Sequence, residues 1–309
     1  MVDLFSAILT VLGLTLFEII TSLDNAVINS DVLRTMSPRA KRWFMIWGLL
    51  VAVFLVRGLL PLLIVWASNP ALGPAGAFMF SFNENPIILR AVEETEPIIL
   101  IAGGVFLIFL FFHWLFMEEK SYGLRAERFI QRHGLWFYTV VSIILAIVAW
   151  FGIQRSPLLA FGAVIGSTAY FIIHGFRQNA EAREKELIGS TELSDLSKIT
   201  YLEVIDAAFS VDGVLGAFAF TLSVPLIIIG NGLGAIAVRE LTLRNIDAVK
   251  NYRYLKNGAM YSILFLGLIM IANSFGMNIP EWLSPIITFT VIGIFLWKSK
   301  TTLRTYPRR

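Results

Sequence analysis

Two short polar motifs stand inside otherwise apolar stretches of this sequence. Each has an acidic residue, a serine four positions later and an aspartate two positions after the serine. Every residue of the second motif lies 188 positions after its counterpart in the first. An identical spacing of polar side chains in two apolar segments predicts an internal repeat. The motifs are Glu18-x-x-x-Ser22-x-Asp24-Asn25 and Asp206-x-x-x-Ser210-x-Asp212-Gly213.

The side chains of these motifs offer only oxygen atoms to a ligand. Carboxylate, hydroxyl and amide oxygens favour hard cations such as Mg²⁺, Ca²⁺ and Mn²⁺. The chain has no cysteine, which excludes a thiolate metal site, and its three histidines lie away from both motifs. The sequence therefore predicts a divalent-cation site of oxygen ligands. Polar residues in the same segments and in two other apolar segments are further candidates for the site or its path: Asn29 and Glu203 in the motif segments, Arg57 in 43–67 and Asn231 in 224–238.

Acidic residues inside a membrane span are costly, and this cost argues for a counter-ion. An acid at the centre of a spanning helix costs about 2.5–3.5 kcal/mol on insertion scales. A bound divalent cation would offset much of that cost for the five acids of the two segments. The alternative is a purely structural ion-pair network with Arg57, although one arginine cannot pair all five. The acids are Glu18, Asp24, Glu203, Asp206 and Asp212.

Helical periodicity places most of these side chains on two shared faces. At about 100° per residue, Asn25 and Asn29 share a face with the first acid and serine of their motif. Glu203 and Gly213 share a face with the acid and serine of the second motif in the same way. Asp24 and Asp212 each sit about 120° away from these faces in an ideal helix. Either each aspartate faces a different neighbour, or the helix unwinds locally beside it.

The composition requires a lipid environment for much of the protein surface. The 309-residue chain is 57% apolar and only 15% charged, whereas soluble domains are about 25% charged. We predict an all-α, polytopic membrane protein with about nine spans of roughly 20 residues each. The seventh span is short and interrupted by a glycine-rich stretch. No signal peptide is evident. The predicted spans are 4–32, 43–67, 97–117, 135–153, 157–176, 200–222, 224–238, 255–275 and 282–297.

The basic residues alternate strongly between the connections of these spans. Odd-numbered connections and the C-terminal tail hold 22 of the 25 lysines and arginines. Cytoplasmic loops are rich in lysine and arginine, so we expect the N-terminus outside and the C-terminus in the cytoplasm. The two motif helices then run in opposite directions, which predicts two inverted-topology repeats of the kind found in transporters. We divide the chain into a first half (1–177), a charged cytoplasmic linker (178–199) and a second half (200–309).

The two motif segments resemble those of the TerC-like integral membrane proteins, named for tellurium resistance. The resemblance covers most of the chain, and its specific part is Glu18 to Asn25 together with Leu202 to Gly213. It implies a relation to the LysE-type transporter superfamily and manganese export. Gly213 departs from the pattern, because the first half has an asparagine there. By position, the resemblance implies as metal ligands Glu18, Asp24, Asn25, Asp206 and Asp212.

The function that we expect is secondary export of a divalent cation by alternating access, with manganese as the favoured substrate and calcium as the alternative. We do not expect an enzyme, a cofactor or a nucleic-acid partner; the partners are the lipid bilayer and the metal ion, and a homo-oligomer is compatible with the sequence. The expected location is a plasma membrane of the bacterial inner-membrane type. Two other functions stay open: a metal-stabilised membrane scaffold of a stress-response complex, and an intramembrane aspartyl-type hydrolase using paired acids.

Overall fold

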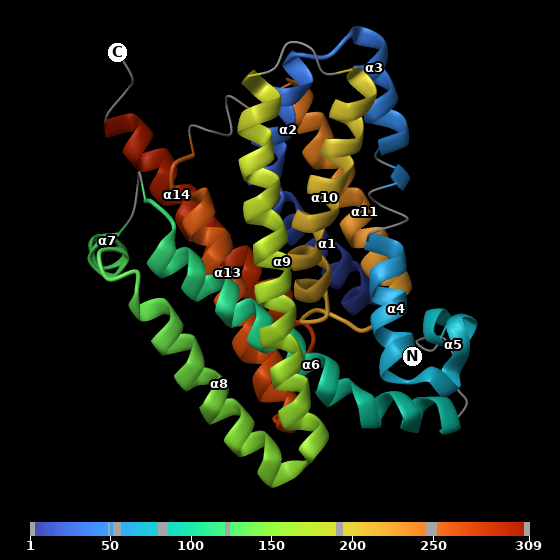
Figure 1. The fold of residues 1–309 in the computed structure, drawn as a ribbon. Coiled ribbons are helices and arrows are strands. Elements are labelled where there is room, and N and C mark those ends of the chain that lie inside the picture. The colour runs from blue at the N-terminus through green and yellow to red at the C-terminus, as the bar shows by residue number, and fades with distance from the viewer. Residues whose placement is uncertain are drawn as a thin grey trace.

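The computed structural model of this chain is helical throughout the part that it describes (Figure 1). The described residues are 4–48, 50–51, 57–79, 86–120, 124–189, 194–244 and 252–305. No strand occurs among them. The prediction of an all-α fold is therefore confirmed for these residues.

The described helices follow one another along the chain in two halves. The N-terminal half contains α1 (Leu4–Thr21), α2 (Leu23–Arg34), α3 (Pro38–Trp43), a π-helix (Phe44–Gly48), α4 (Leu59–Ser68), a 3₁₀ turn (Pro70–Leu72), α5 (Gly73–Met79), α6 (Pro86–Met117), α7 (Arg125–Gln131), α8 (Trp136–Arg155) and α9 (Pro157–Gly189). The remainder contains α10 (Asp195–Ala217), α11 (Val224–Arg244), α13 (Leu255–Ser274) and α14 (Leu283–Thr305).

Seven of the described helices are long and apolar enough to cross a membrane: α1, α6, α8, α9, α11, α13 and α14. The number becomes eight if α4 and the segment Pro70–Phe78, which are bent by 110° at their junction, form one span. The chain is thus a multi-pass membrane protein, but the count of nine is not confirmed. The helix α10 does not qualify, because the charged residues of the second motif lower its mean hydropathy.

The helix α11 corrects the prediction of an interrupted seventh span. It is continuous from Val224 to Arg244, through all three glycines of the stretch 230–234. A methyl group at Gly230 would lie 2.5 Å from Cβ of Leu14, and one at Gly234 would lie 2.5 Å from Cβ of Glu18. The glycines therefore let α1 and α11 approach closely, as small residues do between membrane helices.

Two further boundaries differ from the sequence prediction. The helix α6 begins at Pro86 and runs through Pro97, where a loop was expected before the third span. The helix α9 continues to Gly189, so most of the predicted linker 178–199 is helical. Both extensions carry several charged residues, and a hydropathy pattern cannot separate a charged helix from a loop outside a continuous apolar run.

The first motif helix divides at Ser22, between α1 and α2. The turn that follows α2 contacts the start of α10: the ammonium group of Lys198 donates to the carbonyl oxygen of Thr35 at 3.2 Å. At the other end of the same contact, Gly213 of α10 lies against Glu18 of α1. The segment from Glu18 to Thr35 and the segment from Lys198 to Gly213 therefore run antiparallel.

The core is shared between the two halves of the chain. The helix α6 is the most enclosed span, with 78% of its apolar window buried, and it packs closely on α9 and α13. Gly104 of α6 and Gly267 of α13 meet backbone to backbone, since a methyl group on either would lie about 3 Å from the other's carbonyl oxygen. The helix α1 packs in turn on α11 and α14. The halves are thus interleaved.

Candidate functional site: a buried carboxylate–arginine centre

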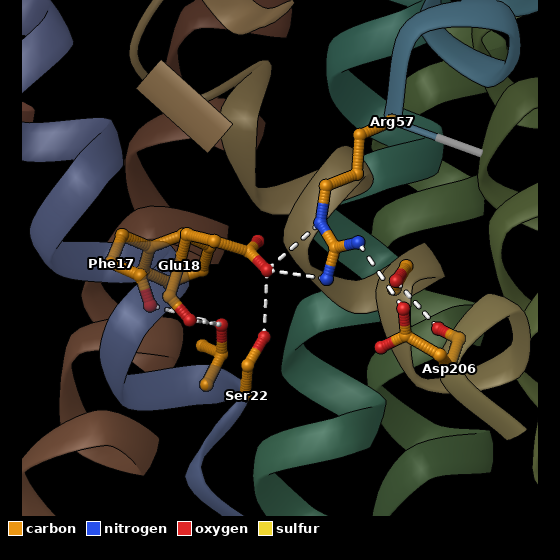
Figure 2. A network of polar contacts seen from close by, with 7 residues as sticks. Phe17, Glu18, Ser22, Arg57 and Asp206 are labelled. Carbon is orange, nitrogen blue, oxygen red and sulfur yellow. Dashed lines mark hydrogen bonds and ion pairs between the residues drawn. The ribbon is translucent and has the colours of Figure 1, made fainter. Parts of the chain in front are cut away.

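Glu18 lies near the end of α1 and is the most enclosed of the motif acids whose side chains the structure describes. Its side chain is 1% exposed. One oxygen, Oε1, accepts hydrogen bonds from Nε of Arg57 at 2.9 Å, Nη2 of Arg57 at 2.6 Å and Oγ of Ser22 at 2.7 Å (Figure 2). Ser22 can reach back to this oxygen because it lies one helical turn after Glu18.

Arg57 joins the two motif helices. It lies just before α4, and its guanidinium group stands between Glu18 of α1 and Asp206 of α10 (Figure 2). Its Nη1 atom lies 3.6 Å from Oδ2 of Asp206, an ion pair too long for a hydrogen bond. Ser210, the serine of the second motif, donates to the backbone carbonyl of Asp206 at 2.5 Å rather than to its carboxylate. The two motifs therefore have the same spacing but different hydrogen bonding.

Asp212 faces a different neighbour from Asp206. Its Oδ2 atom lies 2.5 Å from Nη2 of Arg177 on α9, and both side chains are nearly buried. Because α10 is continuous from Asp195 to Ala217, the 120° offset of Asp212 reflects this second partner and not local unwinding. Of the two explanations left open by the sequence, the structure selects the different neighbour for Asp212.

Glu203 lies one helical turn before Asp206 and has a third arginine as its partner. Nη2 of Arg239, on α11, lies 4.0 Å from Oε1 of Glu203. The same guanidinium group donates through Nη1 to the backbone carbonyl of Phe44 and stacks 4.3 Å from the centre of the Phe44 ring. This contact holds Arg239 beside the π-helix and at the margin of the polar centre. We call the seven residues together the carboxylate–arginine centre: Glu18, Arg57, Arg177, Glu203, Asp206, Asp212 and Arg239.

Several buried polar atoms of this region have no hydrogen-bond partner among the described residues. They include Oε2 of Glu18, Oδ1 of Asp212 and Oδ1 of Asn29. Asn231 of α11 is fully buried, and neither of its amide atoms has a partner there either. Unpaired buried polar atoms are costly and unusual in folded proteins, so these oxygens are available to a cation or a water molecule.

A glycine leaves room beside the free oxygen of Glu18. A methyl group at Gly213 would lie 2.6 Å from Oε2 of Glu18, which is closer than non-bonded atoms approach. The second motif therefore needs a small residue at the position that Asn25 occupies in the first motif. This explains the departure of Gly213 from the repeat by packing, and it places the backbone of α10 next to a free carboxylate oxygen.

Only some of the eleven predicted site residues lie close together in the structure. It brings Glu18, Ser22, Arg57 and Asp206 together. On α10, Asp212 lies nearly two helical turns after Asp206, and Glu203 lies about one turn before it. The side chains of Asp24 and Asn25 lie outside the described part, so their role as ligands stays a prediction. Within the described residues, no three acids or histidines are positioned to share one metal ion.

Two arginines of the centre were not predicted. Arg177 and Arg239 were assigned to cytoplasmic connections, because each follows an apolar run. A helical signal could have found Arg177: Gly166, Tyr170 and His174 precede it at spacings of three and four residues along one face of α9. With three guanidinium groups against four carboxylates, the centre keeps an excess of one negative charge when all groups are ionised.

These features define a multi-pass helical membrane protein with a buried, charge-paired polar centre between α1, α9, α10 and α11. The chain belongs to the family described as "Protein of unknown function (DUF475)", whose model matches residues 23–305. No curated protein and no solved structure matches the chain.

Proposed function

We propose that this protein carries a divalent metal cation, most favourably manganese, across the membrane through the carboxylate–arginine centre. One observation carries the proposal: four carboxylates, from two antiparallel motif helices, lie inside the protein beside only three guanidinium groups. In addition, Oε2 of Glu18 and Oδ1 of Asp212 have no partner among the described residues. Ionisable groups inside a membrane protein mark ion pathways more often than they serve packing.

Arg57 occupies the place that a bound cation would take in the proposed cycle. In the described arrangement its guanidinium group takes the position of a counter-ion between Glu18 and Asp206. A divalent cation that bound both carboxylates would displace the Arg57 guanidinium group. When the cation left, Arg57 would move back between the two carboxylates. Such an exchange keeps the carboxylates neutralised at every stage, which lowers the cost of an empty return step.

The direction of α1 and α10 supports alternating access. The two motif segments run antiparallel and meet at Gly213 and Glu18. In the transporters built from inverted repeats, the binding site lies near the midplane where the repeats meet, and one repeat rocks against the other. We propose this movement, and export as its direction in keeping with the resemblance to TerC-like proteins.

A metal-free structural role is the second candidate, and Arg177 and Arg239 favour it. A single arginine could not pair the acids of the motifs, but three arginines pair four of them. Under this alternative the centre fixes the helices of a membrane scaffold, and no ion moves. No observation on the described residues favours the aspartyl hydrolase.

Flux measurements on purified protein in liposomes would separate the two candidates. Mn²⁺, Ca²⁺ and Mg²⁺ would be compared for the wild type, Asp206→Asn and Asp212→Asn, with a metal-sensitive dye inside the vesicles. Glu127→Gln is the matched control, since Glu127 is a buried carboxylate outside the centre. We expect flux of Mn²⁺ that is lost in the two aspartate variants and kept in the control. Folded wild-type protein without flux of any cation would reject transport and favour the scaffold.

A further inference from the structure

The short helix α7 lies at the edge of the bundle, between the spans α6 and α8 (Figure 1). One residue fixes how α7 faces the protein. Glu127 is 1% exposed, and its Oε2 atom accepts hydrogen bonds from the side-chain amide of Asn257 and the backbone N–H of Leu124, both at 2.7 Å. This carboxylate anchors the inner face of α7 on α13.

The outer face of α7 is basic and aromatic. At about 100° per residue, Arg125, Arg128, Phe129 and Arg132 fall within one arc of about 100°, opposite Glu127. The four side chains line a surface cavity of about 220 Å³. None of the three guanidinium groups has an ion pair or hydrogen bond with any residue that the structure describes. Phe129 is 65% exposed beside them.

The position of α7 places this cavity at the level of lipid headgroups. The span before it ends at Met117 and the span after it begins at Trp136. Leu135 is 87% exposed and Trp136 is 58% exposed at that beginning. Tryptophan concentrates at membrane–water interfaces, and exposed leucine contacts lipid tails. The three arginines therefore lie where phosphates of the bilayer are found.

We propose that this cavity, the α7 arginine pocket, binds the phosphate group of an anionic phospholipid. Guanidinium groups bind phosphate through paired, charge-assisted hydrogen bonds. Basic clusters on amphipathic segments next to a membrane span recognise anionic lipids. The exposed ring of Phe129 fits a lipid better than a soluble phosphate, because it offers an apolar contact to the glycerol and acyl groups beneath the headgroup.

The test uses the full-length protein, purified in a nonionic detergent and stripped of lipid. Binding would be measured by native mass spectrometry and by the midpoint of thermal unfolding, with dioleoyl phosphatidylglycerol compared with dioleoyl phosphatidylcholine. Inorganic phosphate and glycerol phosphate form a third arm without acyl chains. The variant is Arg125→Gln with Arg128→Gln and Arg132→Gln. The matched control is Arg39→Gln with Lys41→Gln and Arg42→Gln, which removes three charges from α3 on the same predicted side of the membrane.

We expect phosphatidylglycerol to bind and stabilise the wild type more than phosphatidylcholine does. A basic residue near an anionic surface contributes about fivefold in affinity, so the α7 triple variant should bind phosphatidylglycerol about 100-fold more weakly. The control should bind within about threefold of the wild type. Three results would overturn the proposal: equal binding of the two lipids, an equal loss in the control, or equal stabilisation by glycerol phosphate. The single variant Arg128→Gln, with an expected loss of about fivefold, serves if the triple variant does not fold.

Discussion

The guanidinium group of Arg57 bonds one oxygen of Glu18 twice and leaves the other oxygen free. Nη2 and Nε lie 2.6 Å and 2.9 Å from Oε1, while Oε2 has no partner among the described residues. The usual arginine–carboxylate pair uses both oxygens. The one-sided geometry keeps a carboxylate oxygen available next to Gly213, and at the same time keeps the charge of Glu18 neutralised.

The first prediction concerns the stability of this buried pair. Removing Arg57 leaves Glu18 buried without a counter-ion, and removing Glu18 leaves Arg57 with only the longer contact to Asp206. Breaking a buried pair from one side costs about 3–5 kcal/mol. We expect Glu18→Gln and Arg57→Gln each to lower the free energy of unfolding by about that amount. The double variant should recover at least half of the loss, because neither charge then remains. Unfolding in mixed micelles of rising dodecyl sulfate content would measure the three values.

Ser22→Ala is the control for this cycle. It removes one hydrogen bond to the same Oε1 atom but leaves both charges in place, so it should cost about 1 kcal/mol. Strictly additive losses in the double variant would contradict a coupled pair.

The second prediction concerns the space at Gly213. A methyl group there would lie 2.6 Å from Oε2 of Glu18, and Arg57 prevents the carboxylate from swinging away. We expect Gly213→Ala to cost about 1–3 kcal/mol through overpacking and to abolish cation flux, if flux is found. Gly293→Ala is the matched control, because a methyl group at Gly293 of α14 has no heavy atom within 4 Å. That variant should gain about 0.5–1 kcal/mol from helix propensity. An equal effect of the two alanines would contradict the close approach of α10 to Glu18.

Part of the polar centre could be predicted from the sequence, and part of it could not. Repeated spacing singled out Glu18 and Asp206, and the structure places both beside Arg57. Their role as metal ligands stays a prediction. Periodicity also placed Asp212 on another face, and the structure adds Arg177 as its partner. The ion pair of Arg177 with Asp212 could not be predicted, because the local sequence of α9 does not determine which helix α9 packs against.

Some element boundaries were predicted wrongly, because glycine and polar residues occur inside helices as well as in breaks and linkers. Gly230 and Gly234 suggested a broken helix, yet they serve the close packing of α1 on α11. The polar extension of α9 looked like a linker, yet it is helical to Gly189. At the two glycines, tertiary contacts outweigh a local propensity that is small in energy.

The third prediction is a pH dependence at the exposed junction of α2 and α10, outside the apolar spans. Asp195 accepts hydrogen bonds from the hydroxyl and from the backbone N–H of Ser37, and the hydroxyl bond is the main cause that lowers the pKa of Asp195. A lowered pKa in the folded state means that the contact stabilises the junction above the ordinary aspartate pKa of about 3.9. The stabilisation is lost as the pH falls through the lower folded-state value.

Hydrogen exchange of the Ser37 amide would measure this, after correction for the intrinsic rate at each pH. Protection should hold from pH 7 to about pH 4, where the ordinary aspartate pKa lies, and then fall. Asp195→Asn should remove the pH dependence. Protection that persists unchanged in Asp195→Asn would show that the carboxylate does not hold the junction.

The last prediction concerns orientation in the membrane. The predicted odd-numbered connections and the tail hold 22 of 25 basic residues, and 20 of these lie outside the carboxylate–arginine centre. The helix α7 should therefore lie in the cytoplasm and the end of α8 outside. The chain has no cysteine, which gives labelling experiments no background. Gln154→Cys, exposed at the end of α8, should react with an impermeant maleimide in intact cells. Ala126→Cys, exposed on α7, should react only after the cells are permeabilised. The reverse pattern would place the α7 arginine pocket on the outer surface and invert the predicted direction of every span.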